Sequence, residues 1–169
     1  MPRIAGVNIV AWLVGAITIY FIGFIIYGLT LGTVWAQQNL MDHGLVTPEQ
    51  ASSITMEQLQ TMTIPGALDT TLAMSLGFVI SLVTALGLCV VQGIMKPKSL
   101  AEALRNGFIL WLGFAATTLS YNVVYGSFSR ITFAIDLLHL FLDFLAASAV
   151  IFLLDGKALS GAPAAAKPA

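Results

Sequence analysis

Three ionisable side chains recur along one apolar stretch in the C-terminal part of the chain. Asp136, His139 and Asp143 are separated by three and four residues, so a helix places all of them on one face. Carboxylates and imidazoles at this spacing can pass protons to one another, bind a metal ion, or hydrogen-bond to neighbouring helices. Proton transfer would indicate a proton or ion pathway, and metal binding would indicate a metal-dependent enzyme. Hydrogen bonding to neighbouring helices would only fix the orientation of the helix.

The metal chemistry has the weakest support from the sequence. Asp136 and His139 have the spacing of the Glu-x-x-His pair of di-iron bundles, but those sites draw carboxylates from several helices. The other histidine, His43, falls in a polar connection, and Cys89 is the sole cysteine. No Ser-His-Asp set, Gly-rich phosphate loop or cysteine pair stands out. We therefore expect no catalytic residues, no cofactor and no metal, unless a dimer pools its ligands.

The preceding apolar stretch offers partners for this polar stripe. One of its stripes contains Trp111, Thr118, Asn122 and Tyr125. A very short turn joins the two stretches, so they must be antiparallel neighbours, with Asn122 near the depth of Asp136 and Thr118 near that of His139. Tyr121 lies beside the stripe. Thr118, Tyr121 and Asn122 are thus candidate members of an intramembrane polar site.

The elements that must position these residues are transmembrane helices. The chain has 169 residues, of which 58% are hydrophobic and 9% charged, whereas soluble domains carry about a quarter charged residues. A bilayer core of about 30 Å needs about 20 helical residues. Four stretches are long enough: Val7 to Gly32, Thr70 to Met95, Gly107 to Gly126 and Ile131 to Leu154. Long apolar runs without alternation predict an all-α integral membrane bundle of four helices.

A single transmembrane domain over residues 1–159 is expected, with a disordered tail over residues 160–169 that is rich in Ala and Pro. The connection from Thr33 to Asp69 contains two helix-start patterns, Thr47-Pro48-Glu49-Gln50 and Thr55-Met56-Glu57-Gln58, which predict short helices there. Ser99-Leu100-Ala101-Glu102 is a similar pattern, so the third helix should begin before the membrane does.

The positions of the Lys and Arg residues predict the orientation of the chain. Most lie on one side of the membrane: Arg3, Lys96, Lys98, Arg105, Lys157 and Lys167. The long first connection has none and the short third connection has Arg130. Because basic residues favour the cytoplasmic side, both termini are expected in the cytoplasm. A cleaved signal peptide is the alternative, but the first apolar run is much longer than a signal core.

Two apolar stretches carry small residues suited to close helix packing. Gly28 and Gly32 form a small-xxx-small pattern, and Gly77, Ser81 and Thr84 make a small, mildly polar face on the second stretch. Tyr27 and Trp35 fall near the end of the first stretch, where aromatic rings often lie at the membrane interface.

Several short motifs resemble a bacterial family catalogued as domain of unknown function 1761. They are Asn8, Gly23-Phe24-Ile25-Ile26-Tyr27, Gly32, Trp35, Trp111-Leu112-Gly113-Phe114, Asn122 and Ile135-Asp136. Ile26 departs from the pattern, because the family commonly has Trp there. The resemblance implies a small four-helix protein of the bacterial cytoplasmic membrane, and it implies no established activity. It adds Asn8, Gly23, Tyr27, Trp35, Asn122 and Asp136 as candidate functional positions.

Three functions remain open at this point. A noncatalytic bundle that assembles with itself or with a larger membrane complex is the leading hypothesis, because of the small-residue faces and the lack of a catalytic set. The alternative is a proton or small-solute transporter or channel subunit that uses Asp136, His139 and Asp143. The third is a metal-dependent membrane enzyme. The net charge of −1 excludes nucleic acid as a partner, so the lipid bilayer is the expected environment.

Overall fold

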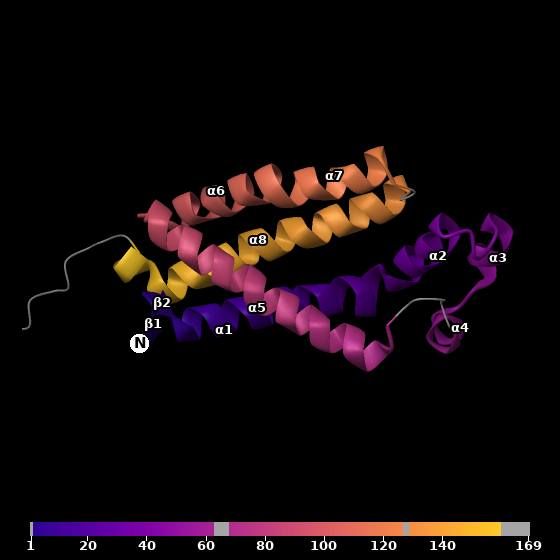
Figure 1. Cartoon of the computed structure of the whole chain (residues 1–169), viewed down its shortest axis with the longest axis horizontal. Helices are drawn as coiled ribbons and strands as arrows, with labels where there is room; N and C mark the ends of the chain where they lie inside the picture. Colours follow the sequence, from indigo (N-terminus) through magenta and orange to yellow (C-terminus); the bar gives the residue numbers. More distant parts are fainter. Residues whose placement is uncertain (1, 63–67, 127–128, 160–169) are drawn as a thin grey trace, which may run out of the picture.

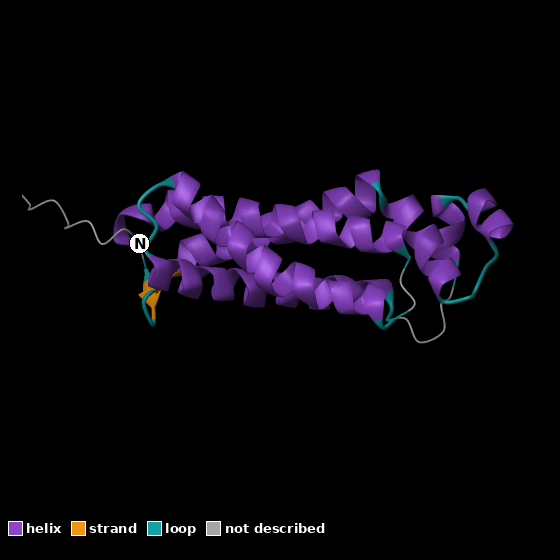
Figure 2. Ribbon diagram, turned by 90° about the horizontal axis from the view of Figure 1, so that it is seen from above, coloured by secondary structure: helices purple, strands orange, loops and turns teal. Residues whose placement is uncertain are grey.

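A computed structural model describes residues 2–62, 68–126 and 129–159 of the chain. The described part is almost entirely helical (Figures 1 and 2). Its elements are β1 (Arg3–Ile4), β2 (Val7–Asn8), α1 (Ile9–Gly23), η1 (Phe24–Thr30), α2 (Gly32–Asp42), α3 (Pro48–Ser53), α4 (Met56–Thr61), α5 (Thr70–Met95), α6 (Leu100–Leu110), η2 (Trp111–Ala116), α7 (Thr117–Val124) and α8 (Arg130–Leu159). The segments η1 and η2 are π-helical. The predicted tail, residues 160–169, lies outside the described residues.

Four helical segments are long and apolar enough to cross a membrane: Ile9–Thr30, Thr70–Met95, Leu100–Val124 and Arg130–Asp155. The all-α prediction with four spans is confirmed, and the protein is a multi-pass membrane protein. The third span begins earlier than the predicted Gly107, because Ser99 caps its helix by accepting from the Glu102 amide at 3.2 Å. Glu102 does not complete a capping box, since its carboxylate accepts from the amide of Lys98 instead.

The helix α8 is the central element of the bundle. It packs against α1, α5 and α6, and Figure 1 shows α5 crossing in front of it. The core between α1, α5 and α8 consists largely of small and branched side chains, with Ala16, Ala85 and Ala147 fully buried. Large apolar side chains such as Ile80 and Leu153 are instead exposed, as expected of a surface that faces lipid.

The two ends of the bundle differ. One end, where Figure 1 shows the hairpin of β1 and β2 and the start of α6, is here called the basic end, because Arg3, Lys96, Lys98 and Arg105 lie in or next to these elements in the sequence. A hairpin of β1 and β2 lies there, and its turn at Ala5 and Gly6 has positive φ at both residues, which Gly6 adopts without strain. The opposite end, the α2–α4 end, carries the three short helices.

The predicted short helices α3 and α4 are confirmed, including their capping boxes at Thr47 and Thr55. They are attached to α2 by a hydrogen bond from Gln37 to the carbonyl of Ile54. The end of α2 is attached to the start of α8, because the Asp42 carboxylate accepts from the Ser129 amide at 2.9 Å and from the Thr132 hydroxyl at 3.0 Å. The helix α2 is thus fixed relative to α8.

Candidate functional site

The fourth span presents its polar stripe to the first span and to α2. Asp136 accepts two hydrogen bonds on the same oxygen, Oδ1, from the Tyr27 hydroxyl at 2.7 Å and from the Trp35 indole nitrogen at 2.8 Å. These donors stabilise a carboxylate that apolar lipid alone would strongly disfavour. Tyr27, Trp35 and Asp136, all candidate residues from the sequence, therefore form one cluster.

The local backbone explains how Tyr27 and Trp35 reach the same carboxylate. Eight residues of ideal α-helix would turn the two side chains about 80° apart. The π-helical turns of η1 and the non-helical Leu31, whose amide bonds to the carbonyl of Ile26 at 2.8 Å, change this register before α2 begins. The two rings then meet edge to face, with centroids 5.2 Å apart. Short π-helical segments occur frequently at functional sites.

His139 lies against the first span where that span has no side chain. A Cβ atom on Gly23 would come 3.1 Å from Nε2 of His139, so a larger residue there would displace the imidazole. The ring packs edge to face on Tyr27 with centroids 4.9 Å apart, and its Nδ1 lies 3.3 Å from the Tyr27 hydroxyl. Gly23 thus leaves room for the His139 ring, and the Tyr27 ring packs against it.

Asp143 continues the cluster toward the middle of the membrane. Its side chain is 3% exposed and its Oδ2 lies 3.1 Å from Nε2 of His139. This is ion-pair distance, but the ring nitrogen does not point at the carboxylate well enough to make a hydrogen bond, and Asp143 Oδ1 has no partner among the described residues. A buried carboxylate without full hydrogen bonding is expensive. Asp143 therefore ends the cluster as a buried carboxyl group in contact with His139.

Together these contacts form a series of titratable side chains, whose last step, from His139 to Asp143, is a close approach without a hydrogen bond. It runs from Asp136 to the Tyr27 hydroxyl, then to His139, then to Asp143, with no step longer than 3.3 Å. Seven residues of helix separate the two carboxylates, about 10 Å along the axis. Asp143 lies at the middle of the span Arg130–Asp155, so the series covers part of the membrane half nearer the α2–α4 end.

The series borders a cleft of about 620 Å³. The cleft is lined by Tyr27, Trp35, Asp136 and His139 together with Ala73, Met74, Leu119 and Leu140. The apolar residues come from α5, α7 and α8, so the polar cluster forms one wall of an otherwise apolar space. Sites for small molecules commonly have this composition and this size.

The third span does not supply the partners predicted for it. Thr118, Asn122 and Tyr121 are exposed, Tyr121 to 59%, and within the described residues no hydrogen bond or ring contact joins them to the stripe on α8. Trp111 does contact α8, by donating to the carbonyl of Leu137 at 3.3 Å. The prediction assumed one continuous α-helix, whereas the π-helical η2 lies between Trp111 and Thr117 and turns the later residues away.

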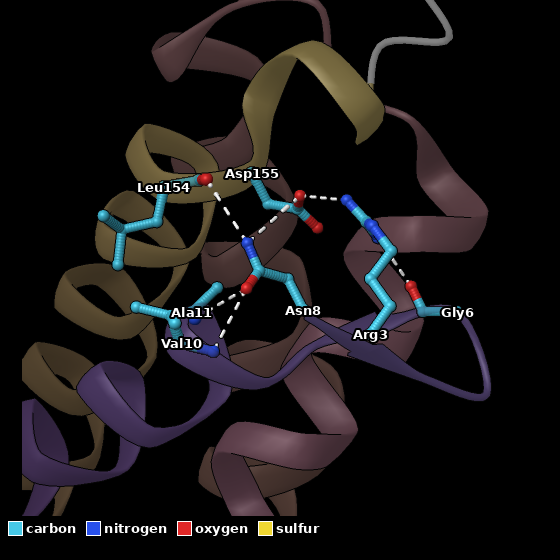
Figure 3. A network of polar contacts seen from close by, with 7 residues as sticks. All are labelled: Arg3, Gly6, Asn8, Val10, Ala11, Leu154 and Asp155. Carbon is cyan, nitrogen blue, oxygen red and sulfur yellow. Dashed lines mark hydrogen bonds and ion pairs between the residues drawn. The ribbon is translucent and has the colours of Figure 1, made fainter. Parts of the chain in front are cut away.

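Asn8 belongs to a different network, at the basic end (Figure 3). Its Oδ1 caps α1 by accepting from the amides of Val10 and Ala11, and its Nδ2 donates to the carboxylate of Asp155 at 3.3 Å. Arg3 forms an ion pair with the same carboxylate. Asn8 thus joins the start of α1 to the end of α8 and lies apart from the cluster around Asp136. The sequence contained a signal for this contact, because Arg3 precedes the first span and Asp155 follows the predicted fourth span, and both positions fall on the same side of the membrane.

No metal site is apparent in the part of the chain that the structure describes. No group of three or more His, Cys, Asp and Glu side chains is arranged there to hold an ion. His43 follows the last residue of α2, and its side chain bonds to the carbonyl of Asn39 in the same helix. The metal hypothesis gains no support from the geometry.

Comparison with known proteins agrees with the resemblance seen in the sequence. Residues 10–152 match the family described as "Protein of unknown function (DUF1761)". No curated protein and no solved structure gave a match. Gly23, Tyr27, Trp35 and Asp136 all lie inside the matched segment, whereas Asn8 lies just before it. On the strength of a match that covers most of its length, the chain belongs to the DUF1761 family.

Proposed function

We propose that this protein is a transporter subunit that moves protons through Asp136, Tyr27, His139 and Asp143. The series of side chains with steps of 2.7 to 3.3 Å carries the proposal. Intramembrane ionisable residues are costly, at about 2.5 to 3.5 kcal/mol for an aspartate at the centre of a helix, and they commonly mark proton or ion pathways.

The extent of the series favours a transporter over an open channel. On α8 no titratable side chain lies between Asp143, at the middle of the span, and Asp155 at the basic end, and the intervening residues are apolar apart from Ser148. Passage through the other half of the membrane therefore requires movement of the helices. A proton acceptor at the middle of a bundle can be exposed to either side by such a movement.

Proton flux in vesicles tests the proposal. Purified protein is reconstituted with a pH-sensitive dye inside and a potassium diffusion potential as the driving force. Asp136→Asn retains an oxygen that accepts from Tyr27 and Trp35 but cannot exchange a proton, so flux should fall at least about ten-fold while insertion is unchanged. Asp143→Asn should behave alike.

Glu57→Gln is the matched control, because it makes the same chemical change at an exposed site on α4. It should leave flux unchanged. Wild-type flux no greater than that of empty vesicles would contradict the proposal, as would equal losses in Glu57→Gln and Asp136→Asn.

The orientation and location of the protein belong to the same proposal. The basic end carries Arg3, Lys96, Lys98 and Arg105, and because basic residues favour the cytoplasmic side we propose that this end and both termini lie in the cytoplasm of a bacterial cell. The α2–α4 end then faces outward. Reporter fusions to the C-terminus and to the connection near residue 45 should report opposite sides of the membrane.

Assembly with a second copy or with a larger complex is retained as a further proposal, supported by Gly28. This glycine is exposed on η1, and a Cβ there would meet only the ring of Phe24, at 3.2 Å. Gly77, in contrast, faces Tyr20 of the same chain, so it supports packing within one subunit. Gly28→Leu should therefore change the oligomer mass in native mass spectrometry, and an unchanged mass would count against assembly at this face.

A further inference from the structure

The cleft beside Asp136 has a chemical composition that selects for one class of ligand. Its lining residues include one carboxylate, Asp136, and no Lys or Arg within the described chain. Both hydrogen bonds to Asp136 end on Oδ1. The second oxygen, Oδ2, accepts none from the described residues and remains able to bind a ligand.

Aromatic rings lie beside the same carboxylate. Tyr27 packs edge to face with Trp35 and with His139, at centroid distances of 5.2 and 4.9 Å, and all three rings line the cleft. The faces of Tyr and Trp rings attract organic cations, and aromatic residues recur in sites that bind quaternary ammonium groups. A carboxylate beside such rings adds direct charge complementarity.

The rest of the cleft is apolar. Ala73 and Met74 come from α5, Leu119 from α7 and Leu140 from α8. Figure 1 shows α5 and α7 diverging toward this end of the bundle, and both helices have exposed apolar residues that face lipid. The volume of about 620 Å³ falls within the range of sites for small organic molecules, about 300 to 1,000 Å³.

We propose that the cleft binds a lipophilic organic cation, with its ammonium group between Asp136 Oδ2 and the Tyr27 and Trp35 rings and its apolar part against Leu119 and Met74. The inference deepens the proposed function, on which it rests, by naming the ligand of the same site. The cation and a proton would compete for one carboxylate, so the protein would exchange one for the other.

Equilibrium binding to the full chain in lipid nanodiscs tests this assignment. The probe is radiolabelled octyltrimethylammonium, and octanol and octanoate serve as neutral and anionic comparisons. Empty nanodiscs provide the background from partitioning into lipid. We expect saturable binding of the cation alone, weakened at least about ten-fold by Asp136→Asn, which removes the charge but keeps the hydrogen bonds to Oδ1.

Two substitutions to tryptophan test the position of the apolar part. Leu119→Trp fills the cleft and should weaken binding, whereas Leu112→Trp adds the same side chain at an exposed site of η2 outside the cleft and should not. Equal binding by wild type and Asp136→Asn, or octanoate binding as tight as that of the cation, would overturn the assignment.

Asp143→Asn separates the ligand from proton transfer, because Asp143 does not line the cleft. It should lose proton flux and keep cation binding. If the wild type shows proton flux but no cation binding, the ligand assignment is wrong and the proposal of proton transport still holds. If it shows cation binding that depends on Asp136 but no proton flux, the proposal of proton transport is wrong and the binding site still holds.

Discussion

The Tyr27 hydroxyl connects two titratable side chains of α8. It donates to Asp136 at 2.7 Å and lies 3.3 Å from Nδ1 of His139. Tyr27→Phe removes this connection and keeps the ring that packs on Trp35 and His139. We expect proton flux to fall at least about ten-fold, while the free energy of unfolding falls by only about 1 kcal/mol, the net value of one hydrogen bond. Flux assays and thermal unfolding measure the two effects.

Tyr20→Phe is the control for this substitution. Tyr20 lies on the same span and packs edge to face on Phe78, and among the described residues no hydrogen bond or ring contact joins it to the cluster around Asp136. Its loss of a hydroxyl should leave flux unchanged. A relay through Tyr27 is contradicted if the two variants conduct equally well.

Part of the candidate site could be predicted from the sequence at this scale. The stripe of Asp136, His139 and Asp143 follows from helical spacing alone, and the structure shows all three in contact distance of one another or of Tyr27. Tyr27 and Trp35 were expected as interfacial rings, and only the family resemblance marked them as candidates. Their meeting at Asp136 depends on π-helical turns, which spacing rules for the α-helix do not describe.

At the scale of elements, the helices were largely predictable and their relative rotation was not. Span lengths and capping patterns such as Thr47-Pro48-Glu49-Gln50 depend on local composition, so they are visible in the sequence. The face that Thr118 and Asn122 present depends on the π-helical η2, at whose end the Thr117 hydroxyl donates to the carbonyl of Leu112. One shifted turn changes the face of every residue that follows.

The close approach of α6 and α8 can be tested at Gly107. A Cβ there would lie 2.5 Å from Ser148 Oγ and 2.8 Å from the carbonyl oxygen of Phe144, and the second atom is backbone that cannot rotate away. Gly107→Ala should therefore separate the helices and lower the free energy of unfolding by about 1 to 3 kcal/mol. Chemical denaturation in detergent measures the change.

Gly87→Ala is the matched control, because nothing lies within 4 Å of a Cβ at that exposed position of α5. Alanine favours helix over glycine by about 0.5 to 1 kcal/mol, so this variant should be as stable as the wild type or more so. Equal destabilisation of both variants would show that the α6–α8 contact does not limit stability.

At the scale of the whole molecule, the segment before α1 is joined to the last turns of α8 at the basic end. Arg3 pairs with Asp155, and Asn8 donates to the same carboxylate (Figure 3). Asp155→Asn should release the hairpin of β1 and β2. Because the Arg3 side chain is partly exposed, solvent screening limits the loss to about 1 kcal/mol, or about five-fold faster hydrogen exchange near residues 3–9. Mass spectrometry of the N-terminal peptide measures that rate.

Asp69→Asn serves as the comparison, because Asp69 caps α5 at the other end of the bundle by accepting from the amide of Leu72. Asparagine keeps this cap, so the variant removes a charge at the other end of the bundle and should leave exchange at residues 3–9 unchanged. If Asp155→Asn leaves exchange at residues 3–9 at the wild-type rate, the contact does not hold the hairpin in place.

The whole site, as described, is built from one chain. The partners of Asp136, His139 and Asp143 lie on η1, α2 and α8 of the same subunit, so a neighbouring copy need not contribute a residue. We therefore expect each chain to conduct independently, whatever the oligomeric state. Co-expressed wild-type and Asp136→Asn chains with different tags, purified and reconstituted at known ratios, should give flux proportional to the wild-type fraction. A dependence on the square of that fraction would instead show that two intact sites act together, which would make assembly part of the mechanism.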